Sequence, residues 1–188
     1  MYAAPGTGVL YGKKELLDAI PPYMGGGEMV GNVKWSGTTY APVPLKFEAG
    51  TQNFAGAPTM VPAIQMLELM EDIEIERNTD EITEYLLEEL PKIPGLRLYG
   101  IPGEAYGQDF RKIPLFSFSV EHCHHEDLAL ILDKMGIALR SGQMCAEPLM
   151  DRYGVTGMLR ASFAPYNTME EAVYFLDSLK KAIKMLEA

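Results

Sequence analysis

The sequence predicts an α/β protein whose C-terminal half forms a small unit of alternating strands and helices. After residue 95, short segments rich in β-branched and aromatic residues alternate with longer segments in which apolar residues recur every three or four positions. Pro91, Pro94 and Gly95 close a helical region that precedes this alternation. We therefore expect two domains, residues 1–93 and residues 94–188.

The composition is that of a globular protein with an acidic surface. Of 188 residues, 47% are hydrophobic and 22% are charged, which is ordinary for a chain with a buried core. The 16 basic and 26 acidic residues give a net charge of −10. This balance argues against nucleic acid and acidic membranes as partners, because both are bound by clustered Lys and Arg. Two cysteines, with neither a membrane-length apolar segment nor a signal pattern, favour the cytoplasm.

The first 93 residues contain one strand-like segment, one hairpin and several helical segments. Pro21 and Pro22 end the first helix, and Trp35 and Tyr40 are the apolar anchors that we expect for the hairpin. The expected elements are a strand at residues 9–11, helices at residues 14–20, 54–70 and 78–90, and a hairpin at residues 33–47; residues 59–75 also have an amphipathic helical pattern.

The alternating pattern itself occupies the last part of the chain. Its final helix begins at Thr168, a favoured N-cap residue, and Glu170 and Glu171 follow in the first turn, where carboxylates are stabilised. The expected strands are residues 96–99, 113–120, 137–139 and 158–163, and the expected helices are residues 126–135 and 168–186.

Residues 136–150 stand out for their chemistry. An apolar segment and a Ser-Gly turn lead to Cys145, and Pro148 follows, which cannot continue a strand ladder or a helix interior. We therefore expect Cys145 to lie on a loop, where reactive residues are common. Arg140, five residues earlier, would favour the thiolate, the reactive form of cysteine. These residues alone leave the alternative open that Cys145 is a small buried apolar residue.

The sequence RSGQMCAEPLM at residues 140–150 closely resembles the cysteine loop of the SufS-type (group II) cysteine desulfurases. These are pyridoxal-phosphate enzymes of fold type I in the class V aminotransferase family, and their group I relatives carry a longer, serine-rich loop. The similarity runs along the whole chain, from Met1 through LRAS at residues 159–162 to YNT at residues 166–168. It implies the C-terminal part of a fold type I transferase, with a remnant of the large domain at residues 1–93 and a small α/β domain at residues 94–188.

The resemblance also implies roles for individual residues. Cys145 would take sulfur from L-cysteine as a persulfide for iron–sulfur cluster assembly, with release of L-alanine. Arg160 would hold the substrate α-carboxylate, and Arg140 would be a second polar contact. Thr51, with Gly50 before it, would reach the phosphate of pyridoxal 5'-phosphate in the other subunit of a homodimer. Thr51 also suits a helix N-cap, and the two roles are compatible.

Two departures from the resembled family affect the expected activity. Gln143 and Met144 replace the two histidines that are common just before the family's cysteine, which removes possible proton carriers. The Schiff-base lysine of the family comes directly before a Met-Tyr pair, so it would precede Met1. We therefore expect the chain alone to be inactive, and the complete enzyme to pass sulfur to an acceptor of the SufE or SufU type.

A cluster of histidines and cysteine at residues 122–125 has the side chains that zinc or copper prefers. Adjacent residues cannot all converge on one ion, because successive side chains of a strand point to opposite faces. We therefore expect no metal there, and a polar junction that caps the next helix.

Two other functions remain possible from the sequence. A selenocysteine lyase or another class V aminotransferase could share the cysteine loop. A different class of function is a stand-alone sulfur-carrier or binding fragment, in which another protein would place the persulfide on Cys145.

Overall fold

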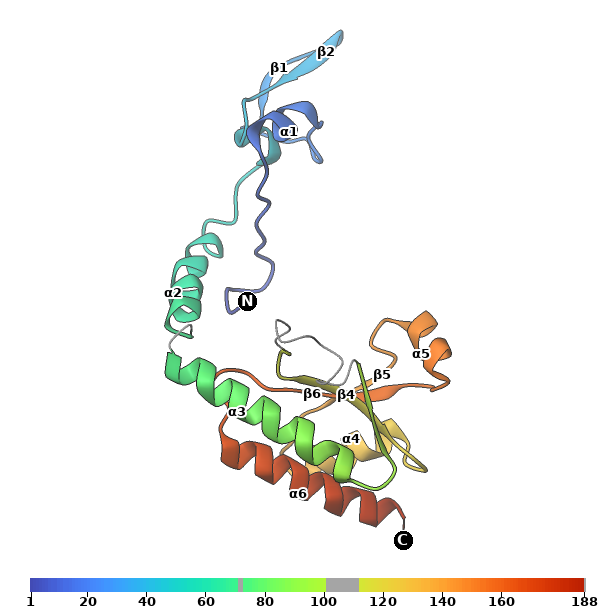
Figure 1. Cartoon of the computed structure of the whole chain (residues 1–188). Helices are drawn as coiled ribbons and strands as arrows, with labels where there is room; N and C mark the ends of the chain where they lie inside the picture. The colour runs from blue at the N-terminus through green and yellow to red at the C-terminus, as the bar shows by residue number, and fades with distance from the viewer. Residues whose placement is uncertain (71–72, 101–111, 188) are drawn as a thin grey trace. The chain divides into compact units, whose positions relative to one another are not determined.

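The computed structural model describes residues 1–70, 73–100 and 112–187. The chain divides into two compact units, Met1–Leu69 and Met70–Ala188. The second unit contains a four-stranded sheet with helices packed against it, and the first consists of short helices, a hairpin and extended segments (Figure 1).

An antiparallel sheet is the centre of the second unit. Its strands are β3 (Leu96–Tyr99), β4 (Leu115–Val120), β5 (Arg140–Gly142) and β6 (Met158–Ser162). Their order in space is β3-β4-β6-β5, so β6 pairs with both β4 and β5. The three-residue strand β5 therefore forms one edge of the sheet.

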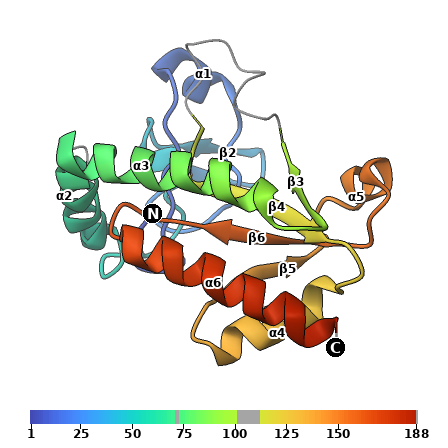
Figure 2. The same ribbon diagram turned by 60° about the horizontal axis from the view of Figure 1, so that its bottom comes forward.

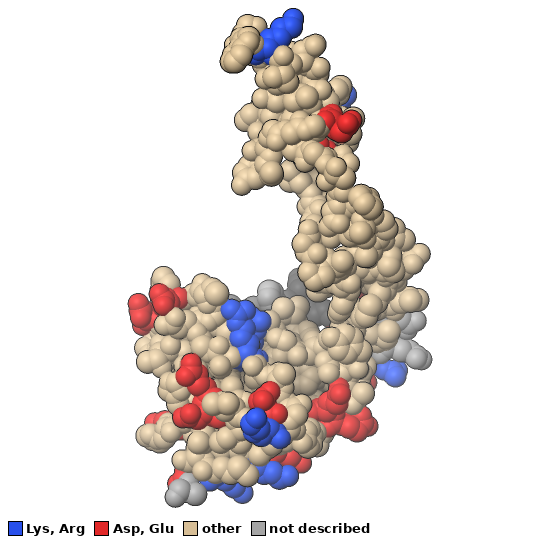
Figure 3. Space-filling model, turned by 180° about the vertical axis from the view of Figure 1, so that it is seen from behind, with Lys and Arg blue, Asp and Glu red and all other residues tan. Residues whose placement is uncertain are grey.

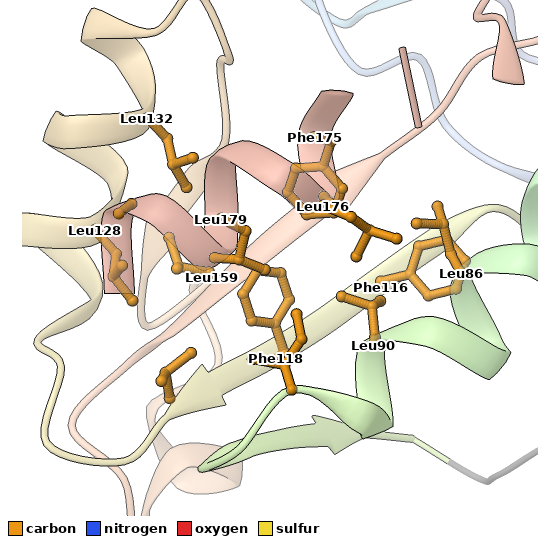
Figure 4. Close-up of a cluster of buried hydrophobic side chains, with 14 of the residues drawn as sticks. Leu86, Leu90, Phe116, Phe118, Leu128, Leu132, Leu159, Phe175, Leu176 and Leu179 are labelled. Atoms are coloured by element: carbon orange, nitrogen blue, oxygen red, sulfur yellow. The ribbon is translucent and has the colours of Figure 1, made fainter. Parts of the chain in front are cut away.

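Three helices cover one face of this sheet (Figure 2). They are α3 (Ile73–Glu89), α4 (His125–Lys134) and α6 (Met169–Leu186). Alternate residues of β4, which are Phe116, Phe118 and Val120, are buried because they point toward the helices. Figure 4 shows these aromatic rings packed among leucines from α3, α4, α6 and β6. Burial of each such side chain stabilises the folded state by about 1.5–3 kcal/mol.

The opposite face of the sheet carries a second, smaller cluster of buried residues. Tyr99 of β3, Met158 of β6 and Met150 of the short helix α5 (Glu147–Tyr153) are each less than a tenth exposed. Tyr99 and Tyr153 pack with their ring centroids 4.9 Å apart. We call this set, with the partly buried Met144, Tyr153 and Val155, the methionine–tyrosine cluster.

The first unit has a much smaller core. Its elements are α1 (Lys14–Ala19), β1 (Val30–Lys34), β2 (Gly37–Tyr40), α2 (Met60–Met70), which runs to the unit's end, and 3₁₀ turns at Leu45–Phe47 and Ala57–Thr59. Met29 and Ala63 are its buried apolar residues. The buried Lys46 ammonium donates to the carbonyls of Asp18 and Ile20, which ties the end of α1 to the first 3₁₀ turn. Charged side chains are sparse on the face of this unit that Figure 3 shows.

The most strongly periodic segments were predicted correctly. The helices α1, α4 and α6 and the strand β3 begin and end within one residue of the expected bounds. The Thr168 hydroxyl accepts the Glu171 N–H at 3.3 Å, and the Glu171 carboxylate accepts the Thr168 N–H at 3.0 Å. This capping box confirms the expected start of α6.

Several expectations about the elements were wrong, and in addition the hairpin ends at Tyr40 and not at residue 47, and α3 begins at Ile73 and not at residue 78. Residues 9–11 form no strand among the described residues, because nothing pairs with them. Trp35 is fully exposed at the hairpin turn and anchors nothing within its own unit. The predicted helix at 54–70 begins only at Met60, since Gly56 and Pro58 favour the preceding turn. The strand expected at 137–139 is instead β5, three residues later.

The division into compact units differs in position from the two expected domains. The boundary between the two units follows Leu69, whereas the expected boundary between the two domains follows residue 93. Helix α3 accounts for the difference, because its Ile82 and Leu86, together with Leu90 just after the helix, belong to the same core as α6. α3 is therefore part of the second compact unit.

The histidine-rich junction between β4 and α4 is a helix start, as expected. The Glu126 N–H donates to Nδ1 of His124, the N-cap of α4, over 3.4 Å. His125 is 9% exposed, and its Nδ1 has no hydrogen-bond partner. Among the described residues, no three His, Cys, Asp or Glu side chains are grouped to hold a metal ion.

Truncation of the central leucine of α6 tests the main core. Leu179→Ala removes a fully buried side chain, so we expect the free energy of unfolding to fall by about 2–5 kcal/mol. Urea denaturation followed by circular dichroism measures this. Leu130→Ala on α4 is the matched control, because Leu130 is 61% exposed and its loss should change stability by less than about 0.5 kcal/mol.

His125 should make stability depend on pH. Burial, and secondly the neighbouring His124, lower the pKa of His125 below its ordinary value of 6.5. The unfolded chain then takes up a proton near pH 6.5 and the folded chain only at lower pH. His125 should therefore leave the free energy of unfolding unchanged above pH 6.5. It should lower this free energy as the pH falls from 6.5 to the pKa that His125 has in the folded chain.

The measurement is urea denaturation at pH 7.5 and at steps down to pH 5. The loss of stability on acidification should be smaller in His125→Leu than in the wild type. His122→Gln is the control, because the His122 side chain is 87% exposed. An unchanged pH dependence in His125→Leu would contradict the assignment.

Candidate active site

The cysteine loop joins the edge strand β5 to helix α5. The chain leaves the sheet at Gly142, and both Met144 and Cys145 adopt a left-handed backbone, with φ of 57° and 58°. The Ala146 N–H donates to the carbonyl of Gln143 at 2.9 Å, which closes the turn. Such a conformation costs about 1–2 kcal/mol for each non-glycine residue, and it is found mainly where surrounding structure enforces it, often at functional sites.

Pro148 follows Glu147 at the start of α5, although a proline here predicts a break in regular structure. It occupies the first turn of the helix, where its missing N–H is no loss and its fixed φ is already helical. Gly154, with φ of 71°, ends the helix in the left-handed conformation that glycine favours. Cys145 is therefore held on a short, structured connection just before a helix.

The thiol of Cys145 is exposed and lies beside a cation. The Arg140 guanidinium donates to its sulfur over 3.6 Å. Cys123, the other cysteine, is half-buried, and burial raises the pKa of its thiol, with a smaller contribution from the Glu187 carboxylate. Of the two thiols, Cys145 is the one in an accessible, positively charged environment.

Two arginines face each other across the last strand pair of the sheet. Arg140 of β5 and Arg160 of β6 are direct partners in the antiparallel ladder, so their side chains share one face. Like charges in such a pair repel each other. Nε of Arg160 is buried without a hydrogen-bond partner. An unpaired buried donor beside a second guanidinium is a site that an anion, such as a carboxylate, would satisfy.

Neighbouring strands add hydroxyl groups to the same face. Ser117 of β4 lies opposite Arg160, and the Tyr99 hydroxyl is 2.8 Å from the Ser119 hydroxyl. The Arg97 guanidinium lies 5.0 Å from the centroid of the Tyr99 ring, a cation–π distance. One face of the sheet is thus apolar and covered by helices, and the other carries arginines, hydroxyls and the methionine–tyrosine cluster.

The remaining two predicted site residues lie in the first unit. Thr51 is exposed, and in the described chain its side chain makes no hydrogen bond. It caps no helix, because α2 begins at Met60. Gly50 has a φ of 81°, and its N–H already donates to the carbonyl of Gly27 at 3.1 Å. The Thr51 hydroxyl is therefore free to bind a ligand. Gly50 instead allows the left-handed turn of the backbone just before Thr51.

Three of the five predicted site residues are thus brought together, namely Arg140, Cys145 and Arg160. The methionine–tyrosine cluster, which includes Met144 of the cysteine loop, was not predicted from the sequence. Its members come from β3, α5 and β6, and methionine and tyrosine are common in ordinary cores. The group of three combines an accessible thiol with an anion-binding arginine pair, which suits attack by sulfur on a substrate that carries a carboxylate.

No helix among the described residues is both long and apolar enough to cross a membrane.

Comparison with known proteins gives concordant results. Residues 1–175 match the family model described as Aminotransferase class-V. A probable cysteine desulfurase of Vibrio cholerae is 39% identical over 99% of this chain and 44% of its own length. The cysteine desulfurase CsdA of Escherichia coli is 38% identical over 99% of this chain and 44% of its own length. The chain thus spans less than half the length of these relatives.

Solved structures agree with the fold. The crystal structure of CsdA (S-sulfonic acid) from Escherichia coli has a TM-score of 0.82 at 39% identity, and the match covers 98% of this chain and 44% of that one. The apo cysteine desulfurase of Thermococcus onnurineus NA1 has a TM-score of 0.79 at 32% identity, over 93% of this chain and 42% of that one. The expected fold class, an α/β part of a fold type I transferase, is confirmed. Because the family model covers most of its residues, the chain belongs to the class V aminotransferase family.

Proposed function

We propose that the chain is the C-terminal part of a pyridoxal-phosphate-dependent cysteine desulfurase of the SufS type. The complete enzyme would convert L-cysteine to L-alanine and leave the sulfur as a persulfide on Cys145. The observation that carries this proposal is the exposed Cys145 thiol, 3.6 Å from the Arg140 guanidinium and next to the arginine pair. The names of the relatives, which are cysteine desulfurases, support the same reaction.

The residues of this chain fit a cofactor and substrate with anionic groups. Arg160 offers a buried Nε without a partner, which would donate to the substrate carboxylate, and Arg140 would add a second contact from the facing strand. Thr51 offers an exposed hydroxyl to the cofactor phosphate, in trans if the complete enzyme is a homodimer. When bound, pyridoxal phosphate supplies an electron-withdrawing ring attached to the substrate amine.

The chemical role of Cys145 follows from sulfur nucleophilicity. Its thiolate attacks the sulfur of the substrate, so that an S–S bond forms and the Cβ–S bond of the substrate breaks. The electron pair of that bond remains with the carbon side, and a proton completes the methyl group of alanine. The persulfide on an exposed loop is then accessible to a sulfur-acceptor protein, for which the SufE and SufU types are our proposal.

The domain assignment belongs to the same proposal. Residues 1–93 would complete the large domain of the enzyme, and residues 94–188 would form the small domain that carries the cysteine loop. Helix α3 would then connect the two while it packs against α6. We further propose that the chain alone is inactive, because none of its lysines directly precedes a Met-Tyr pair, which is where the resemblance places the Schiff-base lysine.

We predict that Cys145 reacts with alkylating reagents at least several-fold faster than Cys123. Cys145 is exposed beside a guanidinium, whereas burial hinders Cys123 and raises its pKa. Limited treatment with iodoacetamide at pH 7.5, followed by peptide mass spectrometry, measures both rates. Faster modification of Cys123 would be incompatible with the assignment.

Fragment complementation tests the reaction itself. The chain is combined with the part of Escherichia coli CsdA that it does not match, pyridoxal phosphate and L-cysteine. We expect alanine release and a persulfide on Cys145, and Cys145→Ser should reduce turnover by about 100-fold or more, since it removes the nucleophile. Cys123→Ser is the matched control and should retain activity. Alanine release that survives Cys145→Ser would rule out the proposed role.

The same assay separates the desulfurase from a selenocysteine lyase. With L-selenocysteine as a second substrate, release of alanine from L-selenocysteine but not from L-cysteine would favour the lyase. Formation of a Cys145 persulfide by the chain alone, from a sulfur donor and without pyridoxal phosphate, would instead favour the stand-alone carrier.

A further inference from the structure

The conformation of the cysteine loop needs a physical cause. Met144 and Cys145 are consecutive residues with left-handed backbone, and neither is the glycine or asparagine that usually adopts it. Gln143 and Cys145 are themselves exposed, so their side chains contribute little packing. Strained backbone of this kind persists only where neighbouring structure holds it.

Met144 is the residue of the turn that is anchored. Its side chain is partly buried against the methionine–tyrosine cluster, whose members Tyr99, Met150 and Met158 are 8%, 3% and 3% exposed. These partners belong to strands β3 and β6 and to helix α5, all of which lie outside the turn at residues 143–146. An unbranched thioether side chain adapts well to an irregular apolar surface of this kind.

The direction of the thiol depends on the same turn. Cys145 directly follows Met144, and its sulfur meets the Arg140 guanidinium at 3.6 Å although Arg140 lies on the preceding strand. If the left-handed turn relaxed, the exposed thiol would lose the restraint that keeps it next to this cation. A contact between two exposed groups contributes little free energy, so this contact cannot itself hold the turn in its left-handed conformation.

We infer that Met144 is a positioning residue for Cys145: its side chain, packed into the methionine–tyrosine cluster, holds the left-handed turn that keeps the Cys145 sulfur beside Arg140. The inference rests on the proposed function for its biological meaning, because Cys145 is the nucleophile there. Its physical content, the distance between a thiol and a guanidinium, is testable without any turnover.

The readout is the ratio of two alkylation rates of Cys145. Iodoacetate is anionic and iodoacetamide is neutral, and both attack the same thiolate with similar size. Their rate ratio therefore cancels exposure and thiolate fraction, and it reports the positive charge beside the sulfur. The rates are measured on the 188-residue chain by peptide mass spectrometry at low ionic strength, where the charge is least screened.

Arg140→Met defines the ratio without the cation, which should lie about threefold to fivefold below the wild type. We expect Met144→Gly to fall to nearly this lower value, since glycine tolerates the left-handed φ but cannot pack into the cluster. Met144→Leu should retain the wild-type ratio, because it keeps an apolar side chain of similar volume. Gln143→Gly, a glycine at the exposed neighbouring position, is the matched control and should also retain it.

A wild-type ratio in Met144→Gly would overturn the inference. An equal fall in Gln143→Gly would do so as well, because general loosening of the loop, and not the anchor, would then be responsible. Circular dichroism verifies that each variant folds, and Met144→Ala takes the place of Met144→Gly if the latter does not. A wild-type ratio in Met144→Gly, with desulfurase activity that depends on Cys145, would overturn the inference and leave the proposed function intact, so the two proposals can fail independently.

Discussion

The register of β5 on β6 determines the geometry of the candidate site. Only three residue pairs join these strands, and they place Arg140 opposite Arg160 and Gly142 opposite Met158. Leu159, between Met158 and Arg160, is fully buried among the helices on the other face. Because side chains alternate between faces, a shift of β6 by one residue would expose this leucine and bury the arginine. Packing on the helix side therefore fixes which residues face the thiol.

The same alternation of side chains places two like charges on one face of the sheet. The arginine pair is a like-charge contact with one buried, unpaired donor, and the hydrophobic core on the far side prevents the strands from relaxing it. An anionic ligand converts this repulsion into paired, charge-assisted hydrogen bonds. The main core thus supplies the stability that allows the opposite face to hold an arrangement that is unfavourable until a ligand binds.

Whether an element could be predicted from the sequence depended on what stabilises it. Helix α6 has a capping box and a continuous apolar face, so local residues specify it and its bounds were predicted. Strand β5 depends on pairing with β6, and the apolar residues 137–139 before it gave a misleading local signal. Helix α5 was not predicted, because Pro148 indicates a helix break when it lies in a helix interior, whereas in the first turn of a helix proline is favoured. Elements that depend on distant partners leave weaker traces in the sequence than elements that stabilise themselves.

The residues of the candidate site differ in the same way in how far the sequence predicts them. Cys145, Arg140 and Arg160 were singled out because the segments that contain them resemble those of the cysteine desulfurases, whereas the residues alone left open a buried apolar role for Cys145. Met144 gave no such signal, since a methionine has no sequence cue for a left-handed backbone, and its packing partners Tyr99 and Met158 lie 45 residues before it and 14 after it. A reactive residue can be recognised from a local sequence motif, but the residues that hold it in place are defined by contacts that only the folded chain creates. Local backbone strain next to a reactive group is therefore a structural guide to such support, because strain has to be held by something.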